Sequence, residues 1–374
     1  MHDPFARLIR QWETLHPYNF VDVLNLANPV PSASLASAAN ATLNEMLGMS
    51  AAVPSERGID VEGQLAHSFQ EGEAPVRIGW ERPFSAEDGS AEDAIAPAVQ
   101  RIAFTFRHAF FDGLGAATFV KRTVRRTLGE RLEPFVIVEW RERIAPYRFF
   151  RSVRDLIRMR RVDSRGGRRG DSPRNRVRFV AFDHSLLDRL RAAGALHDAT
   201  VNDVLATRLA AAMRRVVPPA GKRRETAIAI AVGMRGGSEP FARGVAVAWF
   251  PVFAGDEPVL ESIRDQTARE KQSAAWLRSR MEMRAASVLW PWITPEERER
   301  YFARQYVVTA GLTNLRLDGA ASISNYRRAV ATGPVAPLVV TALTVGECLS
   351  LAITWRSGRF RDDEIDAIES VLKA

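Results

Sequence analysis

Apolar residues recur with two different spacings between residues 99 and 128. Over 99–107 they alternate with other side chains, which predicts a strand. Over 114–128 they follow the spacing of a helix, and Gly129 provides its expected end. We therefore expect residues 108–113 to connect a strand to a helix.

The rest of the chain predicts further helices and strands, with no internal repeat. Pro29 and Pro31 are expected to break the chain before a helix, and the polar segment 85–93 is expected to be a loop. The expected helices cover 4–15, 34–47, 185–193, 200–216, 259–283 and 362–372. The expected strands cover 20–26, 177–182, 227–232, 245–250, 338–343 and 349–355, the last two as a hairpin. This mixture predicts an α/β fold.

A segment rich in Arg and Gly, 164–173, has no apolar residue to bury and is the best candidate for a linker. The chain has 374 residues, of which 46% are hydrophobic, enough for two domains or one large domain. We expect a first unit over 1–163, a linker over 164–176 and a second unit over 177–374.

The formal net charge is +8, and nearly all of the basic residues are arginines. Residues 141–178 hold fourteen arginines and four acidic residues. This arginine block could attract phosphates, an acidic carrier protein or an anionic membrane surface. Alternatively it is a solvated helix and linker whose arginines pair locally. Few aromatic residues and no recognition motif accompany it, so we expect no nucleic-acid partner.

Several classes of chemistry lack their sequence signature. The chain has no phosphate-binding loop, no dinucleotide fingerprint, no Gly-x-Ser-x-Gly elbow and no His/Cys cluster with zinc spacing, so we expect no metal and no bound cofactor. It also lacks an apolar run that could span a membrane and an N-terminal secretory signal. Cys348 is the only cysteine; it is expected to be a buried, inert thiol, and it fits a cytoplasmic location.

Among six histidines, only His108 stands in a distinctive setting, because Asp112 and Gly113 follow four and five residues later. A histidine at the end of a strand can project into a cleft and take a proton near neutral pH. Asp112 could hold the turn by pairing with an arginine, and Gly113 could permit a sharp turn. The alternative is a strand-end histidine followed by an ordinary Asp-Gly turn.

The segment 104–113 resembles the His-His-x-x-x-Asp-Gly motif of the superfamily of chloramphenicol acetyltransferase, nonribosomal peptide condensation domains and wax ester synthase/diacylglycerol acyltransferases. The last group is the most similar. Residues 198–206 are similar to its Asn-Asp segment that opens a helix, and residues 232–252 to its arginine-then-strand segment. Thr313 and Asn314 occupy the place of its later Ser/Thr-Asn turn.

This resemblance implies two chloramphenicol-acetyltransferase-like lobes with a central tunnel between them. His108 would be the general base of acyl transfer from an acyl-CoA or phosphopantetheine thioester to a hydroxyl or amine, without an acyl-enzyme. Asp112 and Gly113 would support the site, with Arg235 as the ion-pair partner of Asp112. The expected substrate-binding residues are Asn202, Asp203 and Asn314, although Asn202 and Asp203 could instead cap their helix.

The chain also departs from the family pattern, since Arg107 stands where the first motif histidine is expected. Because His108 is retained, we still expect an acyltransferase. The departure at Arg107 leaves an alternative, a non-catalytic protein that binds a carrier protein or thioester. The expected acceptor is a small molecule or lipid, with at most peripheral membrane contact. The segment 285–292, with Trp290 and Trp292, could touch a membrane or lipid, or could pack in the core.

Overall fold

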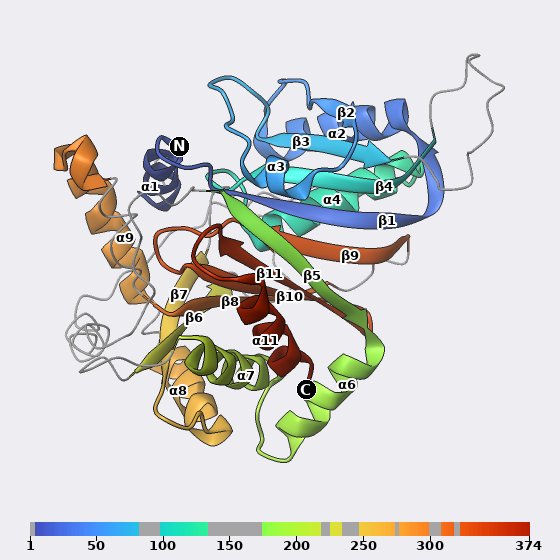
Figure 1. Cartoon of the computed structure of the whole chain (residues 1–374). Coiled ribbons are helices and arrows are strands. Elements are labelled where there is room, and N and C mark those ends of the chain that lie inside the picture. The colour runs from blue at the N-terminus through green and yellow to red at the C-terminus, as the bar shows by residue number, and fades with distance from the viewer. Residues whose placement is uncertain are drawn as a thin grey trace.

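The computed structural model describes residues 4–81, 98–133, 174–217, 225–233, 247–273, 277–298, 308–317 and 322–374. Within these ranges the chain forms two β-sheets, each covered by helices, stacked as two lobes (Figure 1). No described helix is both long and apolar enough to cross a membrane.

The first sheet has the strand order β2-β3-β4-β1-β9. Its strands are β1 (Asn19–Pro31), β2 (Ser55–Arg57), β3 (Val76–Glu81), β4 (Ala98–Arg107) and β9 (Ile323–Val330). Strand β1 lies between β4 and β9 and runs antiparallel to both. Because alternate side chains of a strand face opposite sides, Phe104 and Phe106 lie in the core beneath the helices, and Ala103 faces the other way.

Two helices, α2 (Ser32–Leu47) and α4 (Gly113–Thr127), cover one face of this sheet. The short helix α3 (Val61–Leu65) lies on the opposite face, where Leu65 packs with Val21 and Ala103. The same face is also covered by Phe179 of β5 (Asn175–Asp183), a strand of the second sheet. The two lobes are therefore packed directly together.

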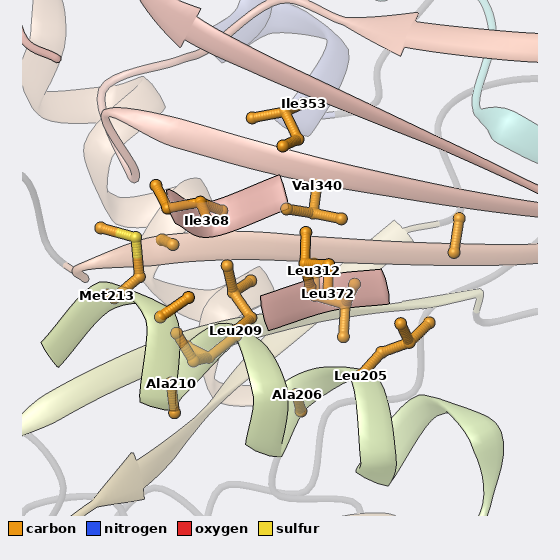
Figure 2. Packing of buried hydrophobic residues seen from close by; sticks show 14 of the residues in the cluster. Leu205, Ala206, Leu209, Ala210, Met213, Leu312, Val340, Ile353, Ile368 and Leu372 are labelled. Carbon is orange, nitrogen blue, oxygen red and sulfur yellow. The ribbon is translucent and has the colours of Figure 1, made fainter. Parts of the chain in front are cut away.

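The second sheet has the order β5-β11-β10-β8-β6-β7. Its remaining strands are β6 (Thr226–Gly233), β7 (Val247–Ala254), β8 (Ala310–Leu317), β10 (Leu338–Val345) and β11 (Cys348–Arg356). Its helices are α6 (His184–Ala195), α7 (Val201–Val216), α8 (Leu260–Ser273) and α11 (Asp362–Lys373). Figure 2 shows α7 side chains such as Leu209 beside Leu312 of β8 and Leu372 of α11, within one apolar core.

Strand β9 joins the first sheet although it comes from the second half of the sequence (Figure 1). It pairs with β1 over seven residue positions, from Phe20 opposite Val330 to Leu26 opposite Ile323. A second connection between the two lobes is made by Glu62 of α3. Its carboxylate accepts hydrogen bonds from Arg176 Nε and Val177 N of β5, both at 3.0 Å.

Most expected elements are confirmed, including the β10–β11 hairpin and the connection between β4 and α4. Three expectations are wrong. Strand β1 continues through Pro29 and ends at Pro31, because a register shift between Asn25 and Val30 accommodates the prolines. The expected helix 259–283 is α8 and a separate helix, α9 (Leu277–Leu289). Asn314 lies within strand β8, not in a turn.

Part of the expected organisation lies outside the described residues. This holds for the loop 85–93, the segment 164–173 and most of the arginine block, so the expected linker and unit boundaries stay predictions. At the described end of the block, Arg176 pairs with Glu62, and Arg178 pairs with Asp366. Both arginines lie in β5, and their partners are 114 and 188 positions away in the sequence, so these pairs do not decide between the two interpretations of the block.

Candidate active site

His108 directly follows β4, where a short turn leads into α4. Its half-buried ring stacks on the ring of Tyr18, with centroids 5.1 Å apart, and meets the edge of Phe20 at 5.2 Å. Gly333, between β9 and β10, lies against Tyr18: a Cβ there would be 2.9 Å from Cε2 of that ring. His108 is therefore held beside segments from both halves of the chain.

The hydrogen bonding of His108 determines its tautomer. Nδ1 lies 3.0 Å from the carbonyl oxygen of Phe111. A carbonyl oxygen only accepts hydrogen bonds, so the neutral imidazole carries its proton on Nδ1 and its lone pair on Nε2. Burial lowers the pKa of His108 from its ordinary value of 6.5, and outweighs hydrogen bonding and the charge of Asp112, which act in the opposite direction. The ring is therefore neutral at pH 7, with Nε2 as the basic atom.

Asp112 supports the turn as the N-cap of α4. Its Oδ1 accepts a hydrogen bond of 2.8 Å from the backbone N–H of Gly115, and the residue is buried. Such a cap satisfies one of the backbone donors that a helix leaves unpaired at its start. The expected partner Arg235 lies outside the described residues, so its ion pair with Asp112 stays a prediction.

Gly113 has a different reason to be glycine from the one expected. Its φ is outside the left-handed region, so the turn itself does not require glycine. Instead, Arg328 Nη1 donates a 2.9 Å hydrogen bond to the Gly113 carbonyl oxygen. A Cβ on Gly113 would lie 2.8 Å from that same nitrogen. The glycine is needed because an arginine of β9 approaches the backbone closely.

That arginine belongs to a buried polar network that sequence reasoning missed. Arg328 binds both carboxylate oxygens of Asp22 in β1, at 2.5 and 2.7 Å, and Tyr326 donates to the same carboxylate at 2.7 Å. All three residues are at most 3% exposed. Burial alone would lower the pKa of Arg328, but the charge of Asp22 raises it. The guanidinium therefore stays charged and fixes the turn between His108 and α4 against β9.

Arg107, at the place of the first motif histidine, is used to hold helix α1 (Pro4–Glu13). Its Nε donates a 2.8 Å hydrogen bond to Glu13 Oε2, and its guanidinium lies over the ring of Phe110, 5.6 Å from the centroid. Burial raises the pKa of Glu13, and the charge of Arg107 opposes this effect. Arg107 thus has a structural role that a neutral histidine could not fill in the same way.

Two of the expected substrate-binding residues lie at the start of α7. Asp203 forms a capping box with Thr200: Oδ2 accepts from Thr200 N at 2.9 Å, and Asp203 N donates to Thr200 Oγ1 at 3.3 Å. Asn202, the second residue of the helix, is half-buried. For Asp203 the structure shows the capping alternative; a role of Asn202 in substrate binding stays a prediction.

Asn314 is exposed in β8 and lies opposite Ala342 of β10. Its neighbour Leu315 points to the opposite face and packs against the core of the first lobe. Asn314 therefore points away from the first lobe, and its expected role in substrate binding stays a prediction.

One other sequence expectation needs correction, and the environment of the two tryptophans can be described. Cys348 is half-buried and not enclosed, and its Sγ lies 2.9 Å from Nε2 of His184. Burial and the charges of Asp183 and Glu347 raise the pKa of this thiol, so an inert thiol remains the better description. The two tryptophans differ in environment: Trp290 is buried, and Trp292 is 85% exposed.

Among the residues that the structure describes, no group of three or more His, Cys, Asp or Glu side chains could hold a metal ion. The candidate site therefore consists of one neutral histidine, its aromatic neighbours and the Asp112 cap. Such a group can accept and return a proton at Nε2.

Comparison with protein families and with curated proteins finds no match by sequence. Solved structures do match. The TRI3 trichothecene 15-O-acetyltransferase from Fusarium sporotrichioides has a TM-score of 0.66 at 11% identity, covering 99% of this chain and 94% of its own. The first condensation domain of the CDA synthetase, in complex with a substrate analogue, has a TM-score of 0.64 at 13% identity, covering 100% and 94%. The condensation domain of the Monacolin K polyketide synthase MokA has a TM-score of 0.63 at 11% identity, covering 98% and 94%.

These matches span nearly the whole length of both chains, and they confirm the expected α/β fold. The protein has the two-lobed, chloramphenicol-acetyltransferase-like fold of condensation domains.

Proposed function

We propose that the protein is an acyltransferase that moves an acyl group from a CoA or carrier-protein thioester to a hydroxyl or amine acceptor. His108 is the general base, and the acceptor attacks the thioester directly. The observation that carries the proposal is the state of His108: a neutral ring at the end of β4, with Nδ1 bound to the Phe111 carbonyl and Nε2 as the basic atom.

The fold supports this assignment. Similar solved structures include a 15-O-acetyltransferase and condensation enzymes. The same fold also carries an epimerization domain, at a TM-score of 0.57, so the fold alone does not determine the chemistry. The reaction class therefore rests on His108 together with the fold.

In the proposed reaction, Nε2 takes the proton of the acceptor hydroxyl or amine as the new acyl bond forms. The thioester carbonyl becomes a tetrahedral oxyanion. When the carbon–sulfur bond breaks, the imidazolium returns its proton to the departing thiolate. The Phe111 carbonyl keeps the ring oriented through both transfers, and it stabilises the imidazolium because Nδ1 still donates to it.

The proposed donor is an acyl-CoA or the phosphopantetheine thioester of an acyl carrier protein, and the acceptor is a small molecule or a lipid. Condensation domains of similar structure come from polyketide and peptide synthetases. A relation to wax ester synthases and a tunnel between the lobes are part of the proposal. Asn202 and Arg235 keep their expected roles within it, whereas Asn314 points away from the first lobe and would contact a substrate only outside a tunnel between the lobes.

The experiment measures thiol release from acetyl-, octanoyl- and palmitoyl-CoA with a panel of alcohols and amines. His108→Ala is expected to lower acceptor-dependent thiol release by roughly 10²- to 10⁴-fold. His184→Ala is the matched control, because that histidine contacts Cys348 in the second lobe. Equal activity of His108→Ala and wild type would contradict the proposal.

A second candidate function is binding without turnover. Two observations favour it: Arg107 replaces the first motif histidine and is committed to Glu13, and the X-domain of teicoplanin biosynthesis, of similar structure at a TM-score of 0.53, was solved in complex with OxyB. Two results together would indicate this function. The wild type and His108→Ala would bind an acyl carrier protein with the same affinity, and neither protein would release thiol.

A further inference from the structure

Tyr18 directly precedes β1, and the proposed reaction gives its side chain no role. The pairing of β1 with β4 places Asn19 opposite Arg107, so Tyr18 and His108 are the next pair beyond the end of that ladder. The backbone N–H of His108 donates to the Tyr18 carbonyl oxygen at 3.4 Å. The two rings are nearly parallel, with 10° between their planes and centroids 5.1 Å apart. The phenol therefore lies directly beside the proposed base.

Two further contacts hold the Tyr18 ring. The ring of Trp12 in α1 meets it edge to face, with centroids 5.9 Å apart. Gly333 approaches its hydroxyl end, where a Cβ would lie 3.2 Å from Cζ and 3.3 Å from Oη. The preceding residue, Thr332, is fixed by Asn175 Oδ1, which accepts from its backbone N at 3.0 Å and from its Oγ1 at 2.7 Å. The phenol is thus held before any substrate binds, as a preorganised donor must be.

The hydroxyl of Tyr18 is available to a substrate. Its Oη makes no hydrogen bond to any residue that the structure describes, and it is not among the described polar atoms that are closed off from solvent without a partner. The residue as a whole is half-buried. Burial raises the pKa of Tyr18 to about 12, so the phenol keeps its proton near neutral pH and can donate. The other described tyrosine, Tyr326, already donates to Asp22.

An acyl transfer needs such a donor beside its base. The acceptor atom, the carbonyl carbon and the oxyanion lie between the two groups, so the base and the donor must be about 5–7 Å apart. Parallel rings with centroids 5.1 Å apart are compatible with this spacing. Of the two described rings that pack on His108, only Tyr18 carries a hydrogen-bond donor, because the other is Phe20.

We propose that the Tyr18 hydroxyl is the oxyanion donor of the acyl transfer, an inference that rests on the proposed function. The acceptor atom bonds to the thioester carbon while Nε2 of His108 takes its proton. The electron pair of the carbonyl double bond moves onto the oxygen, which accepts a hydrogen bond from Tyr18 Oη. Tyr18 keeps its proton throughout. When the electron pair returns, the carbon–sulfur bond breaks and the thiolate takes the proton from the imidazolium.

The first test is Tyr18→Phe, which keeps the ring that stacks on His108 and removes only the hydroxyl. It should lower kcat for acceptor-dependent thiol release by roughly 10²- to 10³-fold, as loss of one oxyanion donor does. The KM values of donor and acceptor should change little, because the hydrogen bond forms with the oxyanion. The acid limb of the pH profile should stay in place, because the aromatic cover of His108 is retained. Unchanged kcat, a loss confined to KM, or a displaced acid limb overturns the proposal.

A binding measurement by calorimetry provides a second test. The trifluoromethyl ketone analogue of acetyl-CoA carries a tetrahedral, hydrated carbon in water, and the methyl ketone analogue carries a planar carbonyl. The wild type should bind the tetrahedral analogue about tenfold more tightly or better, and Tyr18→Phe should lose most of this preference. Equal affinity of the wild type for both analogues, or an unchanged preference in Tyr18→Phe, overturns the proposal.

The kinetic results separate this inference from the proposed function. If the wild type transfers acyl groups, His108→Ala does not and Tyr18→Phe is as active as wild type, only the role of Tyr18 is overturned. If the wild type releases no thiol with any donor and acceptor, the proposed function and the role of Tyr18 are overturned together. Urea unfolding midpoints of the variants that match the wild type show that the comparison is made between folded proteins.

Discussion

At the scale of single residues, the protonation equilibrium and the tautomer of the His108 ring determine whether it can act as the proposed base. Burial against Tyr18 and Phe20 disfavours the imidazolium, and the pKa is lowered from 6.5. The sequence places a histidine at this position of the motif, but it does not indicate which ring nitrogen carries the proton. The tautomer depends on the Phe111 carbonyl, whose direction is determined by the turn.

This balance predicts the pH dependence of the proposed reaction. The neutral base is present above the folded pKa and is lost as pH falls through it. We expect kcat/KM to fall as pH drops through an apparent pKa that lies below 6.5, with about a tenfold loss per pH unit below that pKa. The measurement is the pH profile of acceptor-dependent thiol release. An acid limb centred at or above pH 6.5 would be inconsistent with a lowered pKa of His108.

Gly113 is the second residue whose role the structure corrects. We expect Gly113→Ala to destabilise the protein by about 1–3 kcal/mol, because the added Cβ meets an Arg328 nitrogen that Asp22 holds in place. Urea unfolding monitored by tryptophan fluorescence measures this change. Gly255→Ala is the control, since no atom lies within 4 Å of its Cβ position. Equal midpoints for the two variants would show that Arg328 moves aside freely.

At the scale of elements, the pairing of β1 with β9 is the contact that sequence patterns do not reveal. The two strands are about 300 residues apart, and their buried Asp22–Arg328 ion pair carries no local signature. By contrast, β4, α4 and the β10–β11 hairpin are predicted correctly, because their spacing and turn residues are local. Strands β2, β3, β8 and β9 were not predicted.

The ion pair predicts a large cost when one partner is removed. Arg328→Met should destabilise the protein by about 3–5 kcal/mol, because the Asp22 carboxylate is left buried and unpaired. The double variant Asp22→Leu/Arg328→Met should be more stable than Arg328→Met, since it leaves no buried charge. Urea unfolding of all three proteins provides the comparison. If the double variant is less stable than the single one, the carboxylate is stabilised by other contacts.

At the scale of the whole molecule, the second half of the chain contributes strand β9 to the sheet of the first lobe. The expected unit 1–163 contains β1 to β4 but lacks β9, which covers the edge of β1. The first sheet is therefore completed by the second half of the chain. A division into two independent units would leave the edge of β1 without its partner.

A fragment of residues 1–163 tests this consequence. It should fail to unfold cooperatively and should show poorly dispersed amide resonances, because β1 loses its β9 partner and Asp22 loses Arg328. Mixing it with a fragment of residues 174–374 should restore dispersion. A well-dispersed spectrum from 1–163 alone would show that β9 is dispensable for the first lobe.

The sequence by itself determined the alternating strand, expected over 99–107 and observed over 98–107, the following helix and the place of His108 between them, because those patterns depend on neighbouring residues. The family resemblance implied a supporting role for Asp112 through Arg235, whereas the role that the structure shows is the N-cap of α4. Only the tertiary structure decided that Gly113 admits Arg328, that Arg107 binds Glu13, and that Gly333 packs against Tyr18 beside His108. These contacts join residues that are far apart in the sequence, in one case by more than 300 positions. Such contacts form only when whole sheets and helices pack together.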